Sequence, residues 1–451
     1  MTALYNGRLS SWPFLFEPVI LRRLGITHMT FPLSSSTSTT LVPATSPMQH
    51  YTGLAVLLLG ALALIVPSGY SLGAVMLLLG SAWLLVARPR LGLTRQDGWI
   101  IAALLVYAGV GMLEAGWDGQ GTRGLDKPIR FLFAVPAMLL VMAYPPRLSW
   151  LWSGLALGAI GAGSWAGWQK LIDGVVRAGG YTHLIQYGNL SMLMGVLCLA
   201  GLGWAYVQPR RLPWLLLLGL GALFGIMGSL FSGSRGGWIG FPLVLLVLYR
   251  GYGRGLPALI KAAVLVIVVA GGALVYALPQ TGVQMRVQAA FYDVEQYFTH
   301  NNPATSVGSR FEMWKGAAHL IAEKPLTGWG DNGYFTAMEQ LVDEGVLHPV
   351  VTRYGHAHND FIDAFAKRGL IGLAVLLALY LVPLRLFARQ LQAKGYELRS
   401  LAVAGVLLPV TYIDFGLSQV FMAHNSGVMM YAFWLAVLWG SYSASIKAAA
   451  K

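Results

Sequence analysis

The sequence predicts an all-α integral membrane protein with about twelve transmembrane helices and a long outward-facing loop that contains short helices. Of the 451 residues, 56% are hydrophobic and 11% are charged, whereas soluble globular proteins carry about 25% charged residues. Apolar runs of about 16 to 23 residues, long enough to cross a hydrocarbon core of about 30 Å, recur from Tyr51 to the C-terminus. Backbone polar groups must satisfy one another in lipid, so these runs are predicted to be helical.

The predicted helices cover roughly residues 51–67, 71–87, 98–115, 129–144, 149–169, 186–206, 212–231, 236–250, 257–278, 369–388, 398–418 and 426–445. Residues 1–48, with a Ser/Thr-rich stretch from Ser34 to Ser46, are interpreted as a cytoplasmic tail. The domain organisation is then 49–278 for nine helices, 279–358 for the outer loop, 359–446 for an amphipathic segment and three helices, and 447–451 for a cytoplasmic C-terminus.

The distribution of positive charge predicts the orientation. Eighteen of the 31 Lys and Arg residues lie in alternate connections on the side of both termini, and the positive-inside rule places that side in the cytoplasm. Topology thus accounts for most of the net charge of +13, and no nucleic-acid partner is expected. The single cysteine, Cys198, excludes a disulfide within the chain.

The outer connections carry basic residues that topology does not explain. The longest connection, about 80 residues from Pro279 to His358, exceeds an ordinary loop and should have structure of its own. Ser309 followed by Glu312 predicts a capping box at the start of a helix that Pro325 terminates.

Two arginines are candidate anion ligands. Arg235 is the only charged residue between Arg211 and Arg250 and lies in the sequence Ser-Gly-Ser-Arg-Gly-Gly. The glycine-rich backbone and an adjacent helix N-terminus favour an anion there, although an arginine that snorkels to the headgroups or pairs with a loop carboxylate fits the same pattern. Arg310 lies in the first turn of the predicted helix, where the helix dipole disfavours a cation. Either an anionic ligand or a salt bridge to Glu312 would offset that cost.

His356, His358 and Asn359 end the long loop, immediately before the amphipathic segment that starts at Asp360. No nearby cysteine or His-Glu-x-x-His spacing supports a metal site. A neutral imidazole can accept a proton from a hydroxyl, so a general base is the better interpretation. Asp414, deep in a predicted helix, is either a polar contact within the bundle or a partner for an arginine.

These motifs together resemble the O-antigen ligase/polymerase superfamily. His358-Asn359, nine further residues and Gly369-Leu-Ile-Gly372 resemble the ligase signature in full spacing. Ser-Gly-Ser-Arg235-Gly, Arg310-Phe-Glu-Met-Trp and the block from Glu323 to Gly333 are similar to other recurrent blocks of that superfamily.

The resemblance implies a GT-C-like, metal-independent, inverting glycosyltransferase of the bacterial inner membrane, active on its periplasmic face and without a cofactor. The donor would be O-antigen linked to undecaprenyl diphosphate, and the acceptor a sugar hydroxyl of the lipid A-core oligosaccharide, both reached among membrane lipids. By motif, His358 matches the catalytic base, and Arg235 and Arg310 match the diphosphate ligands. Residues proposed as secondary contacts are Asn359, His356, Arg177, Gln186, Lys127 and Arg130.

Three alternatives remain. An O-antigen polymerase uses the same donor but extends the glycan on its lipid carrier, and the His-Asn-x9-Gly-x-x-Gly block favours the ligase over it. A protein-glycosylating oligosaccharyltransferase of the same superfamily would be expected to carry an added C-terminal domain. A transporter or lipid flippase is disfavoured because charged residues within the helices are sparse and the polar motifs gather on one face.

Overall fold

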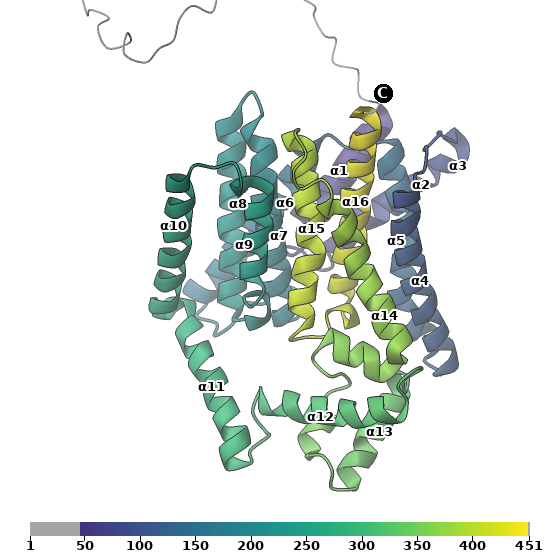
Figure 1. Cartoon of the computed structure of the whole chain (residues 1–451), viewed down its shortest axis with the longest axis vertical. Coiled ribbons are helices and arrows are strands. Elements are labelled where there is room, and N and C mark those ends of the chain that lie inside the picture. The colour runs from purple at the N-terminus through teal and green to yellow at the C-terminus, as the bar shows by residue number, and fades with distance from the viewer. Residues whose placement is uncertain (1–45, 450–451) are drawn as a thin grey trace, which may run out of the picture. The chain divides into compact units, whose positions relative to one another are not determined.

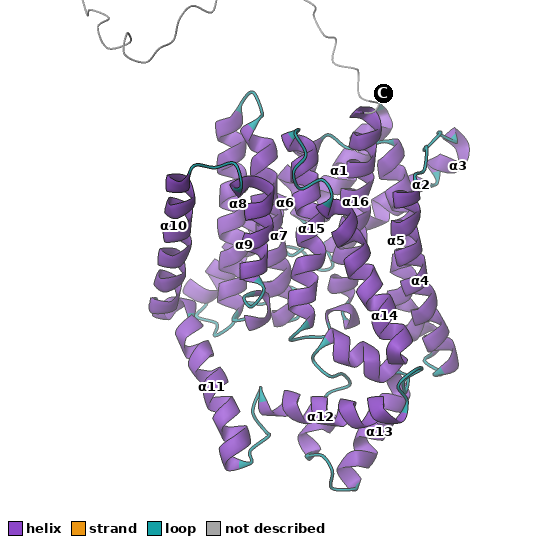
Figure 2. Ribbon diagram, in the orientation of Figure 1, coloured by secondary structure: helices purple, strands orange, loops and turns teal. Residues whose placement is uncertain are grey.

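The computed structural model of the chain describes residues 46–449, and the predicted tail up to residue 45 lies outside them. The described residues are helical throughout, with no strand among them (Figures 1 and 2). The first eight helices are α1 (Pro47–Ala61), α2 (Tyr70–Ser81), α3 (Trp83–Ala87), α4 (Arg95–Trp117), α5 (Gly121–Ala143), α6 (Leu148–Leu171), α7 (Leu184–Tyr206) and α8 (Arg211–Ser232). The short 3-10 helix η2 (Arg235–Gly237) follows α8, and then come α9 (Phe241–Leu248), the π-helical turn η3 (Tyr249–Gly253) and α10 (Ala258–Ala277).

All twelve predicted segments coincide with helices of the bundle. Seven of the described helical segments are long and apolar enough to cross a membrane, and Phe241–Gly253 is a shorter apolar one. An all-α membrane protein is therefore confirmed, while the exact count of twelve spans stays a prediction. The segment predicted over 236–250 starts later, at Phe241, because the chain turns through Gly236, Gly237 and Gly240 and Pro242 then occupies the first helical turn.

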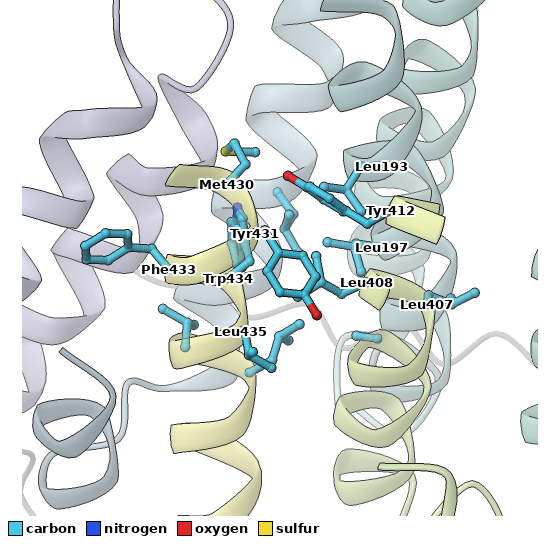
Figure 3. Packing of buried hydrophobic residues seen from close by; sticks show 14 of the residues in the cluster. Leu193, Leu197, Leu407, Leu408, Tyr412, Met430, Tyr431, Phe433, Trp434 and Leu435 are labelled. Atoms are coloured by element: carbon cyan, nitrogen blue, oxygen red, sulfur yellow. The ribbon is translucent and has the colours of Figure 1, made fainter. Parts of the chain in front are cut away.

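The last helices of the bundle are α14 (Asp360–Ala388), α15 (Tyr396–Gly416) and α16 (Asn425–Ala449), with η6 (Phe421–Ala423) between α15 and α16. The core lies where α7, α15 and α16 meet, and Figure 3 shows Leu197, Leu408 and Trp434 packed there. Small residues let the helices approach closely, as membrane helices commonly do. A Cβ on Gly225 of α8 would lie 2.6 Å from the Cα of Gly195 of α7.

The long outer loop contains more helices than the sequence predicted. They are η4 (Pro279–Thr281), α11 (Val283–His300), α12 (Gly308–Glu323), α13 (Asp331–Asp343) and η5 (Pro349–Arg353). Met313, Leu320, Tyr334 and Met338 join α12 and α13 in a small hydrophobic core, to which Ala366 of α14 also contributes. This core attaches the outer helices to the start of α14.

The predicted helix after Ser309 is confirmed, but the predicted capping box is wrong. The helix begins one residue earlier, and its first backbone amide, that of Gly308, donates to Oγ1 of Thr305 at 3.0 Å. Glu312 instead accepts hydrogen bonds from the Tyr297 hydroxyl at 2.8 Å and the His348 backbone amide at 3.0 Å. The carboxylate is thus used between elements and is not available to the helix terminus.

Gly369 divides α14 into two helical segments. Its backbone has φ 63° and ψ −163°, a conformation that L side chains rarely adopt. A Cβ at this position would overlap the backbone of Leu326 and Thr327, and the next residue, Leu370, donates its amide to Pro325 at 2.8 Å. The first glycine of the Gly-x-x-Gly motif therefore breaks the helix where residues 325–327 cross it, and the segment 360–368 becomes a separate short helix.

Substitution Gly369→Ala should lower the melting temperature of the purified protein and reduce its activity. Positive φ alone costs about 1–2 kcal/mol for a residue with a Cβ, and the overlap with Leu326 and Thr327 adds to it. Gly98→Ala in α4 is the matched control, because a Cβ there meets no atom within 4 Å. Equal melting temperatures for the two variants would contradict this role of Gly369.

Candidate active site

His358 lies in the turn between η5 and α14 and is held by contacts to three other elements. Its backbone has φ 50°, which is unusual for a residue other than glycine. The preceding residue, Ala357, donates its amide to Oδ1 of Asp363 at 2.9 Å, and its carbonyl accepts from Nε1 of Trp314 at 2.9 Å. The ring centroid of His358 lies 4.3 Å from that of His356 and 5.1 Å from that of Tyr354. The turn is therefore fixed on both sides of the histidine.

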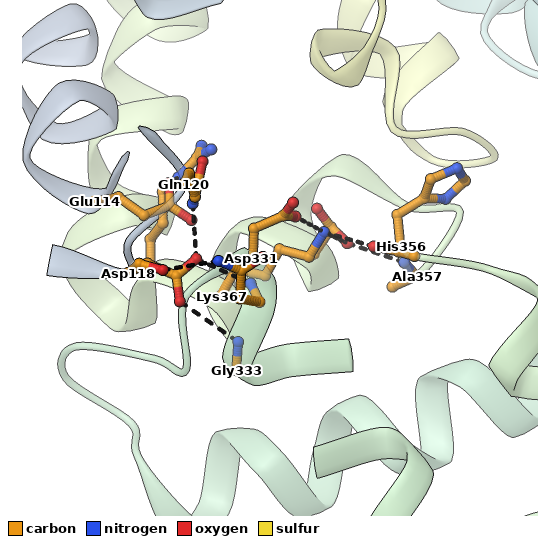
Figure 4. Close-up of polar contacts among 12 residues, drawn as sticks. Glu114, Asp118, Gln120, Asp331, Gly333, His356, Ala357 and Lys367 are labelled. Carbon is orange, nitrogen blue, oxygen red and sulfur yellow. Dashed lines mark hydrogen bonds and ion pairs between the residues drawn. The ribbon is translucent and has the colours of Figure 1, made fainter. Parts of the chain in front are cut away.

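Lys367 connects this turn to the outer helices. Its ammonium donates to the Gly355 carbonyl at 2.8 Å and pairs with Asp331 at 2.6 Å and with Asp363 at 3.4 Å. Figure 4 shows Lys367 and Asp331 directed toward each other, next to the segment that carries His356 and Ala357. Burial alone would raise the pKa of Asp331, but the charge and hydrogen bond of Lys367, together with the charges of Arg368 and Lys127, lower that pKa. The pair therefore stays ionised near neutral pH.

A chain of side chains extends from His358 into the η6 connection. Nδ1 of His358 is hydrogen-bonded to Oε1 of the buried Gln419, whose Nε2 donates to Nε2 of His424 at 3.2 Å. The ring of His424 stacks on that of His183, with the centroids 5.6 Å apart. Since the amide oxygen only accepts, Nδ1 of His358 carries the proton and Nε2 keeps its lone pair.

The surroundings keep His358 neutral. Burial, the His356 ring and the Arg310 guanidinium, in that order, lower the pKa of His358 to about 3. Burial followed by the charge of Lys367 lowers the pKa of His356 to about 4. Both rings are therefore unprotonated near neutral pH, and His358 can accept a proton at Nε2.

A cavity of about 290 Å³, here named the arginine cavity, lies on the side of His358 that faces α8 and α12. Its basic lining residues are Arg177, Arg286 and Arg310, all half-buried. Ser306, Trp314, Leu417 and Ser418 line it as well. Three guanidinium groups around one small space suit a multiply charged anion, because planar guanidinium groups bind phosphate oxygens in pairs.

The segment Ser232-Gly-Ser-Arg-Gly forms another wall of this cavity, through Gly233, Ser234 and Gly236. Gly233 ends α8 with φ 63°, and a Cβ on it would lie 3.2 Å from Nε of Arg286. Arg177 donates from Nε to the Ser232 carbonyl at 2.8 Å. Two of the arginines therefore rest against the glycine-rich turn.

Of the two predicted diphosphate ligands, Arg310 lies in the arginine cavity. Its Nη1 donates to the carbonyl and to Oγ of Ser306 at 2.9 and 3.1 Å. The backbone of Arg235 forms the first residue of η2, between the lining residues Ser234 and Gly236, while its side chain lies outside the described part of the structure. The diphosphate role of both residues stays a prediction.

The secondary candidates occupy different places. Arg177 lines the arginine cavity, and Lys127 lines a second cavity beside α5. Arg130 pairs with Asp126 at 2.8 Å. Gln186 is buried in α7.

Asn359 was predicted to be a secondary contact of the site. Its side-chain amide is hydrogen-bonded to the backbone instead. Its Oδ1 caps α14 by accepting from the amides of Phe361 and Ile362 at 3.0 Å, and its Nδ2 donates to the Leu417 carbonyl at 3.1 Å. Asp414, whose role the sequence left open, is buried in α15 beside Gly240, where it serves as a contact within the bundle.

Sequence reasoning did not select Arg286, Gln419, His424 or His183 as site residues. Arg286 was visible as a basic residue on the outer side of the membrane, but so were several others. Gln419 and His424 lie 61 and 66 positions after His358, and no spacing rule relates them to it. Only the packing of η6 against the histidine turn brings them together.

Comparison with known proteins finds a family that part of the chain resembles. Residues 220–377, about a third of the chain, match the family model described as O-antigen ligase. The matched segment contains the glycine-rich turn, Arg310, His358 and the Gly-x-x-Gly motif, but not Gln419 or His424.

The chain is also similar to two known proteins. An uncharacterized protein of Haemophilus influenzae is 28% identical over 369 residues, which cover 82% of this chain and 92% of the relative. The O-antigen ligase of Escherichia coli K12 is 24% identical over 220 residues, which cover 48% of this chain and 50% of that protein.

Replacement of Gln419 should change the rate and its pH dependence in ways that a structural role would not. Gln419→Leu removes the acceptor that fixes the His358 tautomer, so kcat for glycosyl transfer should fall about tenfold with little change in KM. Gln419→Glu keeps an acceptor and adds a negative charge, which favours the protonated ring and raises the pKa of His358. The acidic limb of the pH–rate profile should then move to higher pH. An unchanged profile for Gln419→Glu, together with full activity of Gln419→Leu, would exclude this function of Gln419.

Proposed function

We propose that this chain is a metal-independent, inverting O-antigen ligase of the bacterial inner membrane, with its active site on the periplasmic face. It transfers a glycan from undecaprenyl diphosphate to a sugar hydroxyl of lipid A-core and so completes lipopolysaccharide. The observation that carries this proposal is the neutral His358, with Nε2 available, close to the arginine cavity. The family match and the predicted orientation of the long loop support it.

In this mechanism, the acceptor oxygen attacks the anomeric carbon of the donor sugar. Nε2 of His358 takes the hydroxyl proton, the new glycosidic bond forms, and the bond to the diphosphate oxygen breaks with its electron pair. Arg310, with Arg235, holds the diphosphate and stabilises the charge that develops on the leaving oxygen. Attack from the face opposite the leaving group inverts the anomeric centre.

The low pKa of His358 fits this sequence of events. Arg310 is one of the groups that lower the pKa of His358. A diphosphate bound at Arg310 would compensate that positive charge and raise the pKa of the ring. The base would then gain proton affinity when the donor is in place, which is when a proton has to be accepted.

His358→Ala should reduce kcat by about 10²- to 10⁴-fold, the usual contribution of a general base, without lowering the melting temperature. His356→Ala should be milder, because the ring of His356 packs against the base and accepts a hydrogen bond from its backbone amide at 3.4 Å but transfers no proton in this mechanism. The assay is ligation of undecaprenyl-diphosphate-linked glycan to lipid A-core by the purified protein in the presence of a metal chelator. A folded His358→Ala variant with normal turnover would refute the assignment. Elongation of the lipid-linked glycan without transfer to lipid A-core would indicate the polymerase instead.

Arg310→Lys should lose most of the activity although it keeps the charge, because an ammonium lacks the paired donors of a guanidinium. Arg353→Lys in η5 is the control, since Arg353 does not line the arginine cavity. The effect should appear in binding of the donor as well as in the rate. If both lysine variants bind donor and turn over as the wild type does, Arg310 has no diphosphate role.

A further inference from the structure

The second cavity, here named the α5 cavity, has a volume of about 440 Å³ and is the larger of the two near His358. Residues from α4, α5, α13 and the first segment of α14 line it, together with three residues of the η6 connection. Its size falls within the range of small-molecule sites, which is about 300–1,000 Å³.

One short segment connects the α5 cavity with the arginine cavity. Leu417 and Ser418 line the arginine cavity, whereas Val420, Met422 and Ala423 line the α5 cavity. Gln419, which binds His358, lies between these two sets along the chain. Asp363 and Lys367, which hold the turn that carries His358, also line the α5 cavity. The segment that contains Gln419, the hydrogen-bond partner of His358, therefore has the arginine cavity at one end and the α5 cavity at the other.

The α5 cavity is lined by four carboxyl groups and four basic side chains, and only some of them are joined in ion pairs. Lys367 pairs with Asp331 and Asp363, and Arg368 pairs with Glu114. Glu114, Asp331 and Lys367 all line this cavity, and Figure 4 labels them among the polar contacts. The carboxyl of Asp360 is buried and accepts from the Tyr380 hydroxyl and the Met422 amide, each at 3.5 Å.

Arg123 and Lys127 are the remaining basic residues of the lining, and neither forms a salt bridge within residues 46–449. Both side chains are exposed. They are four residues apart on α5 and so lie one turn apart on the same face of the helix. An occupant of the cavity thus meets two adjacent, exposed cations that form no direct ion pair, although the charge of Lys127 also acts on Asp331.

We infer that the α5 cavity binds the acceptor by an anionic group, a phosphate or a carboxylate carried by a sugar, which Arg123 and Lys127 hold. This inference rests on the proposed function, because it assigns the arginine cavity to the donor and the α5 cavity to the acceptor. A hydroxyl of the bound acceptor would approach His358 from the side opposite the diphosphate. Inversion requires the acceptor oxygen and the leaving diphosphate to lie on opposite faces of the anomeric carbon, and separate cavities for the two substrates would meet this requirement.

The test is acceptor binding by the full chain, in detergent and without donor, for the wild type and the double variant Arg123→Gln/Lys127→Gln. The probe is a lipid A-core glycolipid that carries phosphates and carboxylates on its core sugars. The double variant should bind at least about tenfold more weakly, the effect of losing a charge-assisted hydrogen bond. The exchange Arg123→Lys/Lys127→Arg should bind almost normally. Arg353→Gln, in the exposed part of η5 and outside the lining of both cavities, is the matched control and should bind as the wild type does.

Two chemically modified acceptors identify the anionic group. If it is a phosphate, enzymatic dephosphorylation should weaken binding to the wild type and abolish the difference from the double variant; if it is a carboxylate, carboxyl reduction should do so. Equal binding by wild type and double variant, or equal losses in the double variant and Arg353→Gln, would overturn the inference. Because binding is measured without transfer, a failure of ligase activity with intact charge-dependent acceptor binding would count against the proposed function and not against this site.

Discussion

The helix break at Gly369 is the constraint on which the site depends. Because the backbone turns there, residues 360–368 form a short helix that packs beneath the outer segment 325–330. The amides of Trp329 and Gly330 donate to the carbonyls of Ala366 and Lys367 at 3.1 and 2.8 Å. Lys367 and Asp363 are thereby placed under the histidine turn, where they fix the backbone of Gly355 and Ala357. A continuous helix would direct these side chains elsewhere, so the Gly-x-x-Gly motif positions the base although it lies eleven residues beyond it.

The electrostatics of the site follow from this arrangement. The half-buried His358 near Arg310 is neutral, which leaves it able to accept a proton, and Gln419 determines which nitrogen does so. The arginines contribute positive charge on one side, where the proposed leaving group needs it. On the other side, Lys367 and Arg368 are largely neutralised by carboxylates, and the two cations of α5 remain. The two cavities therefore differ in the number and spacing of their basic side chains, which would allow each to select a different anionic substrate.

The sequence was sufficient to predict the helices of the bundle, because an apolar run of membrane length has few alternatives to a helix. It also singled out His358, Arg310 and the glycine-rich turn as candidates, through their resemblance to the motifs of the ligase superfamily, and their roles stay predictions. It did not predict α11 or α13, whose apolar residues are few and pack only in the context of the outer loop. The capping box failed because Glu312 is engaged by Tyr297 and His348, partners that come from other elements. Gln419 and Arg286 reach the site through tertiary packing, which local periodicity does not encode.

The central claim is that the donor diphosphate binds in the arginine cavity, which adjoins the turn that carries the base His358. A cryo-electron microscopy structure of the full chain with an undecaprenyl-diphosphate-linked glycan tests it most directly. The account predicts density for the diphosphate in the arginine cavity, in contact with Arg310, with the anomeric carbon directed toward Nε2 of His358. Diphosphate density in the α5 cavity, or an anomeric carbon remote from His358, would contradict it.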